Sequence, residues 1–184
     1  MALVNAHYIE NWISMNCSKL TVIAISLFLF CCSCMSYSFT GTSIPNEVNT
    51  IHIPFFQDNS QSGLGDLSDR LYNALINRFI NQSRLSLNNE QSTADSWMEG
   101  SIQSYSNRPF SVGGDEQANL NEIQIVVRAT FSYANSDEPV YSKSFTGTAT
   151  YDVLDNPVDG ELDAAAEALQ QIANNAFNDA VSNW

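Results

Sequence analysis

The chain has 184 residues and a formal net charge of −13, with 7 Lys and Arg against 20 Asp and Glu. Nucleic-acid binding proteins normally present a basic surface, because neutralised phosphates supply much of their affinity, so this composition excludes that class. All four cysteines lie at or before Cys34. Cleavage before Cys34 would leave about 150 residues, enough for one hydrophobic core, with one thiol and therefore neither a disulfide nor a cysteine-bound metal.

An apolar leader occupies the N-terminal part of the chain. Residues 20–30 read LTVIAISLFLF, are preceded by Lys19 and are followed by CCSC. This pattern is typical of a secretory signal peptide, and the run is shorter than the roughly 20 apolar residues that a membrane-spanning helix needs. A permanent transmembrane helix is the alternative. Residues 1–14 contain no Lys or Arg and are unlike the start of a signal peptide, whereas residues 15–19 (MNCSK) fit one, so Met15 is an alternative translation start.

Cys34 is the predicted lipidation site. A lipoprotein signal ends in an apolar residue, two small residues and the cysteine that is acylated. Ser33 and Cys34 fit the last two places, whereas Cys31 stands where leucine is usual. Cys31 and Cys32 are worse sites because neither follows a small residue. The acyl chains contribute about 0.8 kcal/mol per buried methylene and would hold the attached domain at a membrane surface.

These features divide the chain into three parts. We expect residues 1–33 to form a lipoprotein signal peptide, residues 34–48 a lipidated N-terminus and tether, and residues 49–184 a single folded domain.

The first two elements of that domain are predicted to be a strand and a helix. Residues 49–56 (NTIHIPFF) alternate apolar and polar side chains, which predicts a strand that Pro54 places at a sheet edge or ends. Apolar residues then recur at helical spacing from Leu64 to Ile80, which predicts a helix of about 18 residues. Asp66 and Asp69 suit its positive N-terminal end.

Four further strands and a second helix follow. Residues 84–88 and 97–105 predict short strands, and residues 122–133 (EIQIVVRATFSY) give the clearest alternation in the chain. A turn at 135–138 leads into a returning strand over 140–151, which completes an antiparallel hairpin. Residues 161–183 predict a helix with an alanine-rich apolar stripe that permits close approach to a sheet.

Asp159 is the residue that can cap the last helix. The order β-α-β-β-β-β-α predicts an α+β fold: two helices packed on one face of a four- to five-stranded, mostly antiparallel sheet in a single domain.

Residues 37–45 (YSFTGTSIP), just after the predicted lipidation site, resemble the opening signature of LptE-type lipopolysaccharide-assembly lipoproteins. The agreement extends to the strand NTIHIPFF, the helix that follows it, the segment MEGSI at 98–102, the long hairpin from Ile123, and a terminal helix ending in AVSNW. The resemblance thus covers essentially the whole chain after Cys34.

The resemblance implies a lipid-anchored protein on the periplasmic side of the outer membrane. Such a protein sits in the lumen of the LptD β-barrel and helps to deliver lipopolysaccharide to the outer leaflet, as a plug and not as an enzyme. Family members contact lipopolysaccharide through basic side chains, of which this chain has few, so no lipopolysaccharide contacts are assigned. The many Ser, Thr, Asn and Gln residues suit a polar barrel lumen.

Three local patterns could carry chemistry, and each has a better structural explanation. The motif GGDE at 113–116 lacks the aromatic residue of a cyclic-dinucleotide synthase signature and reads as a turn. The acidic segment 152–163 fails as an EF-hand, because Pro157 and Ala166 occupy ligand positions, and reads as a helix N-terminus. His52 has no nucleophile motif near it. We therefore expect no catalytic residue, cofactor or metal site.

Aromatic residues are the remaining candidates for contact with a partner or with lipid. Tyr37, Phe39 and Trp184 lie near the termini and are the predicted contacts. The others are expected in the core; they are Phe55, Phe56, Trp97 and Phe110. The alternative function is that of a periplasmic lipoprotein without a barrel partner, either an amphiphile carrier or a secretion-channel pilot, and an apolar pocket between helices and sheet would favour it.

Overall fold

The computed structural model describes residues 44–110, 119–155 and 157–182. These residues belong to one compact unit.

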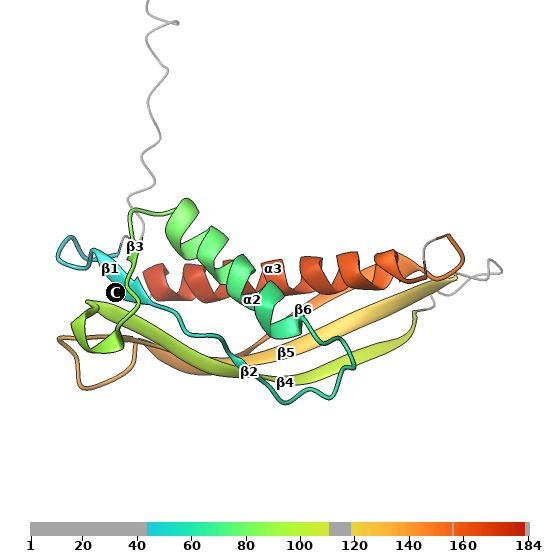
Figure 1. Cartoon of the computed structure of the whole chain (residues 1–184), viewed down its shortest axis with the longest axis horizontal. Coiled ribbons are helices and arrows are strands. Elements are labelled where there is room, and N and C mark those ends of the chain that lie inside the picture. The colour runs from blue at the N-terminus through green and yellow to red at the C-terminus, as the bar shows by residue number, and fades with distance from the viewer. Residues whose placement is uncertain (1–43, 111–118, 156, 183–184) are drawn as a thin grey trace, which may run out of the picture. The chain divides into compact units, whose positions relative to one another are not determined.

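Three long antiparallel strands form most of a six-stranded sheet (Figure 1). They are β4 (Ser96–Phe110), β5 (Leu120–Tyr133) and β6 (Tyr141–Asp152). In the register Ile102 lies opposite Val127, which in turn lies opposite Phe145. Buried and more exposed side chains alternate along most of β5 and β6 and along β4 as far as Ile102, as expected for a sheet with one face covered. The predicted hairpin and its inward-facing residues are therefore confirmed.

The three short strands all run parallel to their neighbours. β1 (Thr50–His52) lies between β3 (Ser86–Leu87) and β4, and β2 (Gln57–Asp58) pairs with a later part of β4. The α+β fold class is confirmed, but the sheet is mixed and has six strands instead of four or five. The parallel pairing of β1 and β3 follows from the helical crossover between them, since parallel neighbours cannot be joined by a tight turn.

Two helices lie on one face of the sheet (Figure 1). α2 (Leu67–Ile76) continues into a π-helical turn, η1 (Asn77–Asn81), so the predicted first helix is confirmed. A 3-10 turn, η2 (Gln91–Thr93), precedes β4. α3 (Asp159–Ser182) is the predicted second helix. Asp159 is its first helical residue and not its cap, and there its negative charge faces the positive end of the helix dipole.

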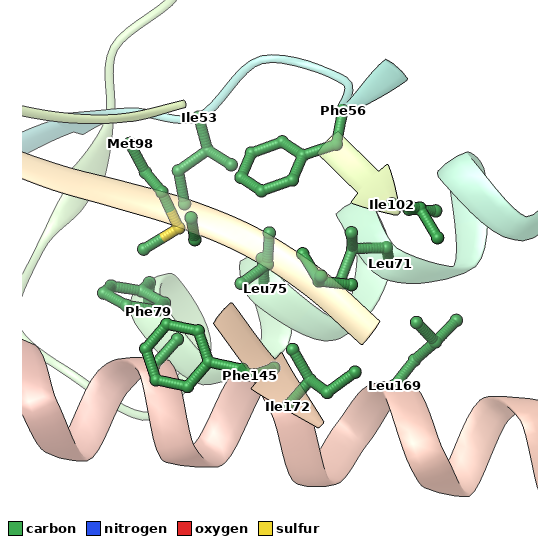
Figure 2. Close-up of a cluster of buried hydrophobic side chains, with 14 of the residues drawn as sticks. Ile53, Phe56, Leu71, Leu75, Phe79, Met98, Ile102, Phe145, Leu169 and Ile172 are labelled. Atoms are coloured by element: carbon green, nitrogen blue, oxygen red, sulfur yellow. The ribbon is translucent and has the colours of Figure 1, made fainter. Parts of the chain in front are cut away.

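The core fills the space between the helices and the sheet. Figure 2 shows Leu71 and Leu75 from α2 and Ile172 from α3 meeting side chains of the sheet. α3 can approach closely because its buried stripe contains six alanines; these are Ala164, Ala165, Ala168, Ala173, Ala176 and Ala180. At the closest point, a Cβ added to Gly147 of β6 would lie only 2.0 Å from the carbonyl oxygen of Ala168. Glycine at 147 is therefore required by the backbone-to-backbone contact.

The prediction that four aromatic residues are core residues is correct only in part. Phe56 is 2% exposed, but Phe55 is 60% exposed, and Trp97 and Phe110 are half-buried. The alternation of 49–56 fails at its end because β1 stops at His52 and the chain leaves the sheet before β2. Phe55 instead stacks on Tyr72 of α2, with ring centroids 4.2 Å apart.

Candidate partner-binding surface

The residues predicted to make contacts from sequence lie outside the described residues. Cys34, Tyr37 and Phe39 precede them, and Trp184 follows them. The GGDE motif at 113–116 falls in the gap between β4 and β5. The lipidation site and these contacts therefore stay predictions, and the described surface has to be assessed on its own geometry.

One face of the three long strands lies opposite the helices and is covered by neither of them (Figure 1). Its side chains are mainly hydroxyls and amides at exposed or half-exposed positions. They are Ser101, Gln103, Ser104, Ser106, Gln124, Thr130, Ser142, Ser144, Thr146, Thr148 and Thr150. We call this set the hydroxyl face. Sequence alternation alone predicted polar residues here, but not that three strands would align them into one surface.

Hydrogen bonds link the three long strands across the hydroxyl face, between β5 and β6 and also from β6 over β5 to β4. The hydroxyl groups of Thr130 and Ser142 are 2.9 Å apart, and an Nη2 group of Arg128 donates to Ser142 Oγ at 3.3 Å. Ser144 Oγ donates to Gln103 Oε1 at 3.0 Å. Each hydroxyl has one donor and two acceptor sites, so these groups keep capacity for bonds to another molecule. The exposed groups of this face can thus bond to a polar surface that covers them.

The charges on the hydroxyl face nearly cancel. Arg108 bonds Glu122 at 2.8 Å, Arg128 is a diagonal cross-strand neighbour of Glu99, two residues out of register, and Asp152 lies at the end of β6. The helix side is different, because its charged side chains are predominantly acidic. Its acids are Asp66, Asp69, Glu161, Asp163, Glu167 and Asp179, against the basic residues Arg70, Arg78 and Lys143. A partner that neutralises little charge therefore fits the hydroxyl face better.

A carboxylate clamp holds β1 against the start of β4. Asp95 Oδ2 accepts hydrogen bonds from the backbone N–H groups of Asn49 and Thr50 and from Thr50 Oγ1, each at 2.9 Å. The bond from Asn49 and then that from Thr50 hold the pKa of the Asp95 carboxyl below its usual value, because they stabilise the charged form. Nearby, Arg84 Nη2 donates to the Ile44 carbonyl at 2.8 Å. Together these bonds hold residues 44–50, the first part of the described chain, against β4 and the residues before β3.

A second polar cluster ties the start of α3 to the other end of the sheet. Tyr105 Oη donates to Glu161 Oε1 at 2.6 Å, and Asn107 Nδ2 donates to Tyr151 Oη at 2.7 Å. Burial, and then the bond to Glu161, raise the pKa of the Tyr105 hydroxyl. The first bond joins β4 to α3, and the second joins β4 to β6. The evident role of the cluster is to hold the helix on the sheet.

His52 and the acidic segment, which were considered for catalysis and metal binding, form hydrogen bonds within the fold. His52 Nδ1 lies 2.9 Å from the Asn88 carbonyl oxygen, and Asp152 Oδ1 accepts the N–H groups of Leu154 and Asp155 in the turn before α3. Within the described ranges no three His, Cys, Asp or Glu side chains gather where they could hold a metal ion. Neither of the helices described there is long and apolar enough to cross a membrane.

Comparisons with known proteins were made for sequence and for structure. No curated protein sequence matches the chain significantly. A lipoprotein from Caulobacter crescentus CB15 is similar in structure with 17% identity, a TM-score of 0.47, and coverage of 71% of this chain and 87% of that one. PelC from Paraburkholderia phytofirmans, solved as a dodecamer, has 10% identity, a TM-score of 0.49, and coverage of 78% and 94%. A minor lipoprotein from Acinetobacter baumannii has 12% identity, a TM-score of 0.45, and coverage of 73% and 92%.

These structural likenesses are partial and of low identity, so the assignment depends on the sequence profile of a family. The profile of the LptE family, described as lipopolysaccharide-assembly, matches residues 48–182. The match spans β1 to α3, that is, all the elements described above. The chain therefore belongs to the LptE family of lipopolysaccharide-assembly lipoproteins.

Proposed function

We propose that this protein is an outer-membrane lipoprotein that plugs an LptD-type β-barrel and assists it in inserting lipopolysaccharide into the outer leaflet. It is anchored through Cys34 on the periplasmic side and performs no catalysis. Family membership supports the role in lipopolysaccharide assembly. That the partner is an LptD-type barrel goes beyond family membership, and the hydroxyl face is the observation that supports it.

The chemistry of the hydroxyl face suits the interior of a barrel. The lumen of a large membrane barrel is lined by the polar, inward-pointing side chains of its strands. A plug that presents hydroxyls and amides exchanges hydrogen bonds to water for bonds to that wall, whereas an apolar face would leave wall groups unsatisfied. The near balance of charge on this face also avoids the cost of burying unpaired ions.

The length of the sheet supports the same placement. β4 has 15 residues, and at about 3.4 Å per residue an extended strand of that length spans roughly 50 Å. A bilayer with its headgroup regions is about 40–45 Å thick. A sheet of this length therefore reaches across the membrane when it lies along the axis of a surrounding barrel.

A soluble amphiphile carrier is less well supported by the interior of the domain. Such a carrier needs an apolar cavity between its layers. Here that space is filled by buried side chains from both helices and the sheet, including Phe79, Leu169 and Ile172 (Figure 2). The pocket between α2 and α3 is open to solvent and has a volume of about 420 Å³; it is lined by Arg70, Asn73, Ala74, Asn77, Ala166 and Gln170.

The proposal is tested by affinity purification of the C-terminally tagged full-length protein from outer membranes in mild detergent. We expect a large β-barrel protein to co-purify in roughly stoichiometric amount and to remain bound in high salt, since the hydroxyl face makes few ionic contacts. Recovery of the lipoprotein alone, or with a secretin, contradicts the proposal and favours the carrier or pilot role.

A further inference from the structure

β6 is a free edge of the sheet. The strand order β3-β1-β4-β5-β6 places it last, and within the described residues it pairs only with β5. A long edge strand exposes a row of unpaired backbone groups, which proteins usually cover or protect because another chain can add to it. β6 has 12 residues, so the way in which its edge is covered determines what can bind there.

Hydrogen bonds at two positions show which backbone groups of β6 point outward. Val153 N–H, directly after the strand, donates to the Asn119 carbonyl at 2.8 Å, toward β5. Thr148 N–H donates instead to the Gln171 side chain of α3 at 3.2 Å, away from β5. Because inward and outward bonding alternate along an antiparallel strand, the even-numbered residues of β6 direct their N–H and C=O groups to the free edge.

Only the second half of this edge is covered by α3. Gly147 is in backbone contact with Ala168, and Gln171 takes the N–H of Thr148. From Lys143 to Thr146 the strand and the helix instead border an open groove of about 470 Å³. On the helix the groove is lined by Asn175, Asn178 and Asp179, and Lys143 forms an ion pair with Asp179. The outward N–H and C=O groups of Ser144 and Thr146 lie along this open half.

We propose that the β6 edge from Ser142 to Thr146 receives an extended polar segment of a protein partner, which adds to the sheet as a further strand. The inference rests on the proposed function, in which that partner is the surrounding barrel. Main-chain bonds to an exposed edge supply affinity in this mode of recognition, and alternate side chains supply specificity. On the helix side the added strand would meet two amides and the ion pair of Lys143 with Asp179, which favours polar side chains; on the other side it would meet hydroxyls.

A second copy of this chain fits the edge less well. Joining two β6 strands about a two-fold axis would place both α3 helices on the same face of the extended sheet. α3 carries the exposed acids Asp163 and Glu167 as well as Asp179, and the whole chain has a net charge of −13. Like charges brought together in this way oppose association. A segment that brings basic side chains is the better complement.

The test uses two substitutions at one position in the full-length protein. Thr146→Pro removes an outward N–H and adds a ring on the edge, yet costs no bond to β5, and proline is tolerated on edge strands for that reason. Thr146→Ala keeps the N–H and removes only the side chain. In the co-purification described above, we expect the barrel recovered with Thr146→Pro to fall at least about tenfold. With Thr146→Ala we expect recovery within twofold of the unchanged protein.

Equal recovery of the barrel with Thr146→Pro and the unchanged protein overturns the inference while leaving the proposed function intact. Failure of the unchanged protein to recover any barrel overturns both. If Thr146→Pro does not fold, photo-crosslinking from a label on Asn175→Cys decides instead, because Asn175 lines the groove and is not part of the hydroxyl face: a covalent adduct with the barrel supports the inference. An adduct with a second copy of the chain, or an Asn175→Cys thiol that is unreactive in the isolated protein, overturns it.

Discussion

Replacing Gly147 with alanine should destabilise the domain severely for so small a change. The added Cβ would lie 2.0 Å from the Ala168 carbonyl oxygen and 2.7 Å from its carbon. Both atoms belong to the backbone of α3, so no side chain can rotate to make room. The helix has to move away from β6 by more than about 1 Å to restore ordinary van der Waals distances.

The expected cost follows from what that movement undoes. Ala165, Ala168 and Leu169 are fully buried at this contact, and a gap of 0.5–1 Å already forfeits about a quarter to a half of each contact energy. Overpacking of this kind typically costs about 1–3 kcal/mol. We expect a value near the upper end, about 3 kcal/mol, because the obstructing atoms are main chain. For a domain of this size that corresponds to a fall in Tm of about 10 °C.

Thermal unfolding followed by circular dichroism measures this effect, with Gly65→Ala as the matched control. A Cβ at Gly65 would have nothing within 4 Å, so the same substitution there should leave the free energy of unfolding within about 0.5 kcal/mol, or raise it slightly. A Gly147→Ala protein that unfolds within 2 °C of the unchanged one, on the order of 0.5 kcal/mol, would refute the close backbone packing of α3 on β6.

Four further substitutions test the polar contacts. Asp95→Ala should lower the free energy of unfolding by about 1–2 kcal/mol at neutral pH. Because the folded-state pKa of this carboxyl is depressed, that loss should shrink as the pH falls below about 4, and a constant difference down to pH 2 would contradict the clamp. Tyr105→Phe should lower the free energy of unfolding in urea by about 1 kcal/mol, since it removes the bond to Glu161. Tyr141→Phe should be neutral or stabilising, because in the described part of the chain the buried Tyr141 hydroxyl has no hydrogen-bond partner. A larger loss for Tyr141→Phe than for Tyr105→Phe would contradict the hydrogen bonding described for the two hydroxyls. Thr130→Leu on the hydroxyl face should leave stability within about 0.5 kcal/mol but reduce co-purification of the barrel, and a variant that recovers as much barrel as the unchanged protein would count against that face as the contact.

The elements with a strong period were predictable, and those set by long-range geometry were not. The segment 122–133 alternates cleanly because one face of β5 is buried and the other is open. The parallel pairing of β1 with β3 could not be predicted from the sequence pattern, since strand direction depends on the route of the crossover. β2 has only two residues, too few to show a period. The exposure of Phe55 followed from the exit of the chain from the sheet, which alternation cannot reveal.

The chemistry of the hydroxyl face could be predicted from the sequence, but its shape could not. Serine and threonine residues at every second position of 142–150 predicted a polar outer side for that strand. Their alignment with Ser101 and Gln124 into one face depends on strand register, and the freedom of the β6 edge depends on strand order. The sequence shows Gly147 only as a glycine within a strand, because the backbone that excludes a Cβ there belongs to Ala168 of α3, twenty-one positions further along the chain.

The measurement that tests the central claim most directly is the appearance of newly made lipopolysaccharide at the cell surface when this protein is depleted in its own host. The account predicts that surface lipopolysaccharide falls as the protein is lost, and that the full-length chain restores it while Cys34→Ala restores it poorly. Unchanged delivery of lipopolysaccharide to the outer leaflet after complete depletion would contradict the account.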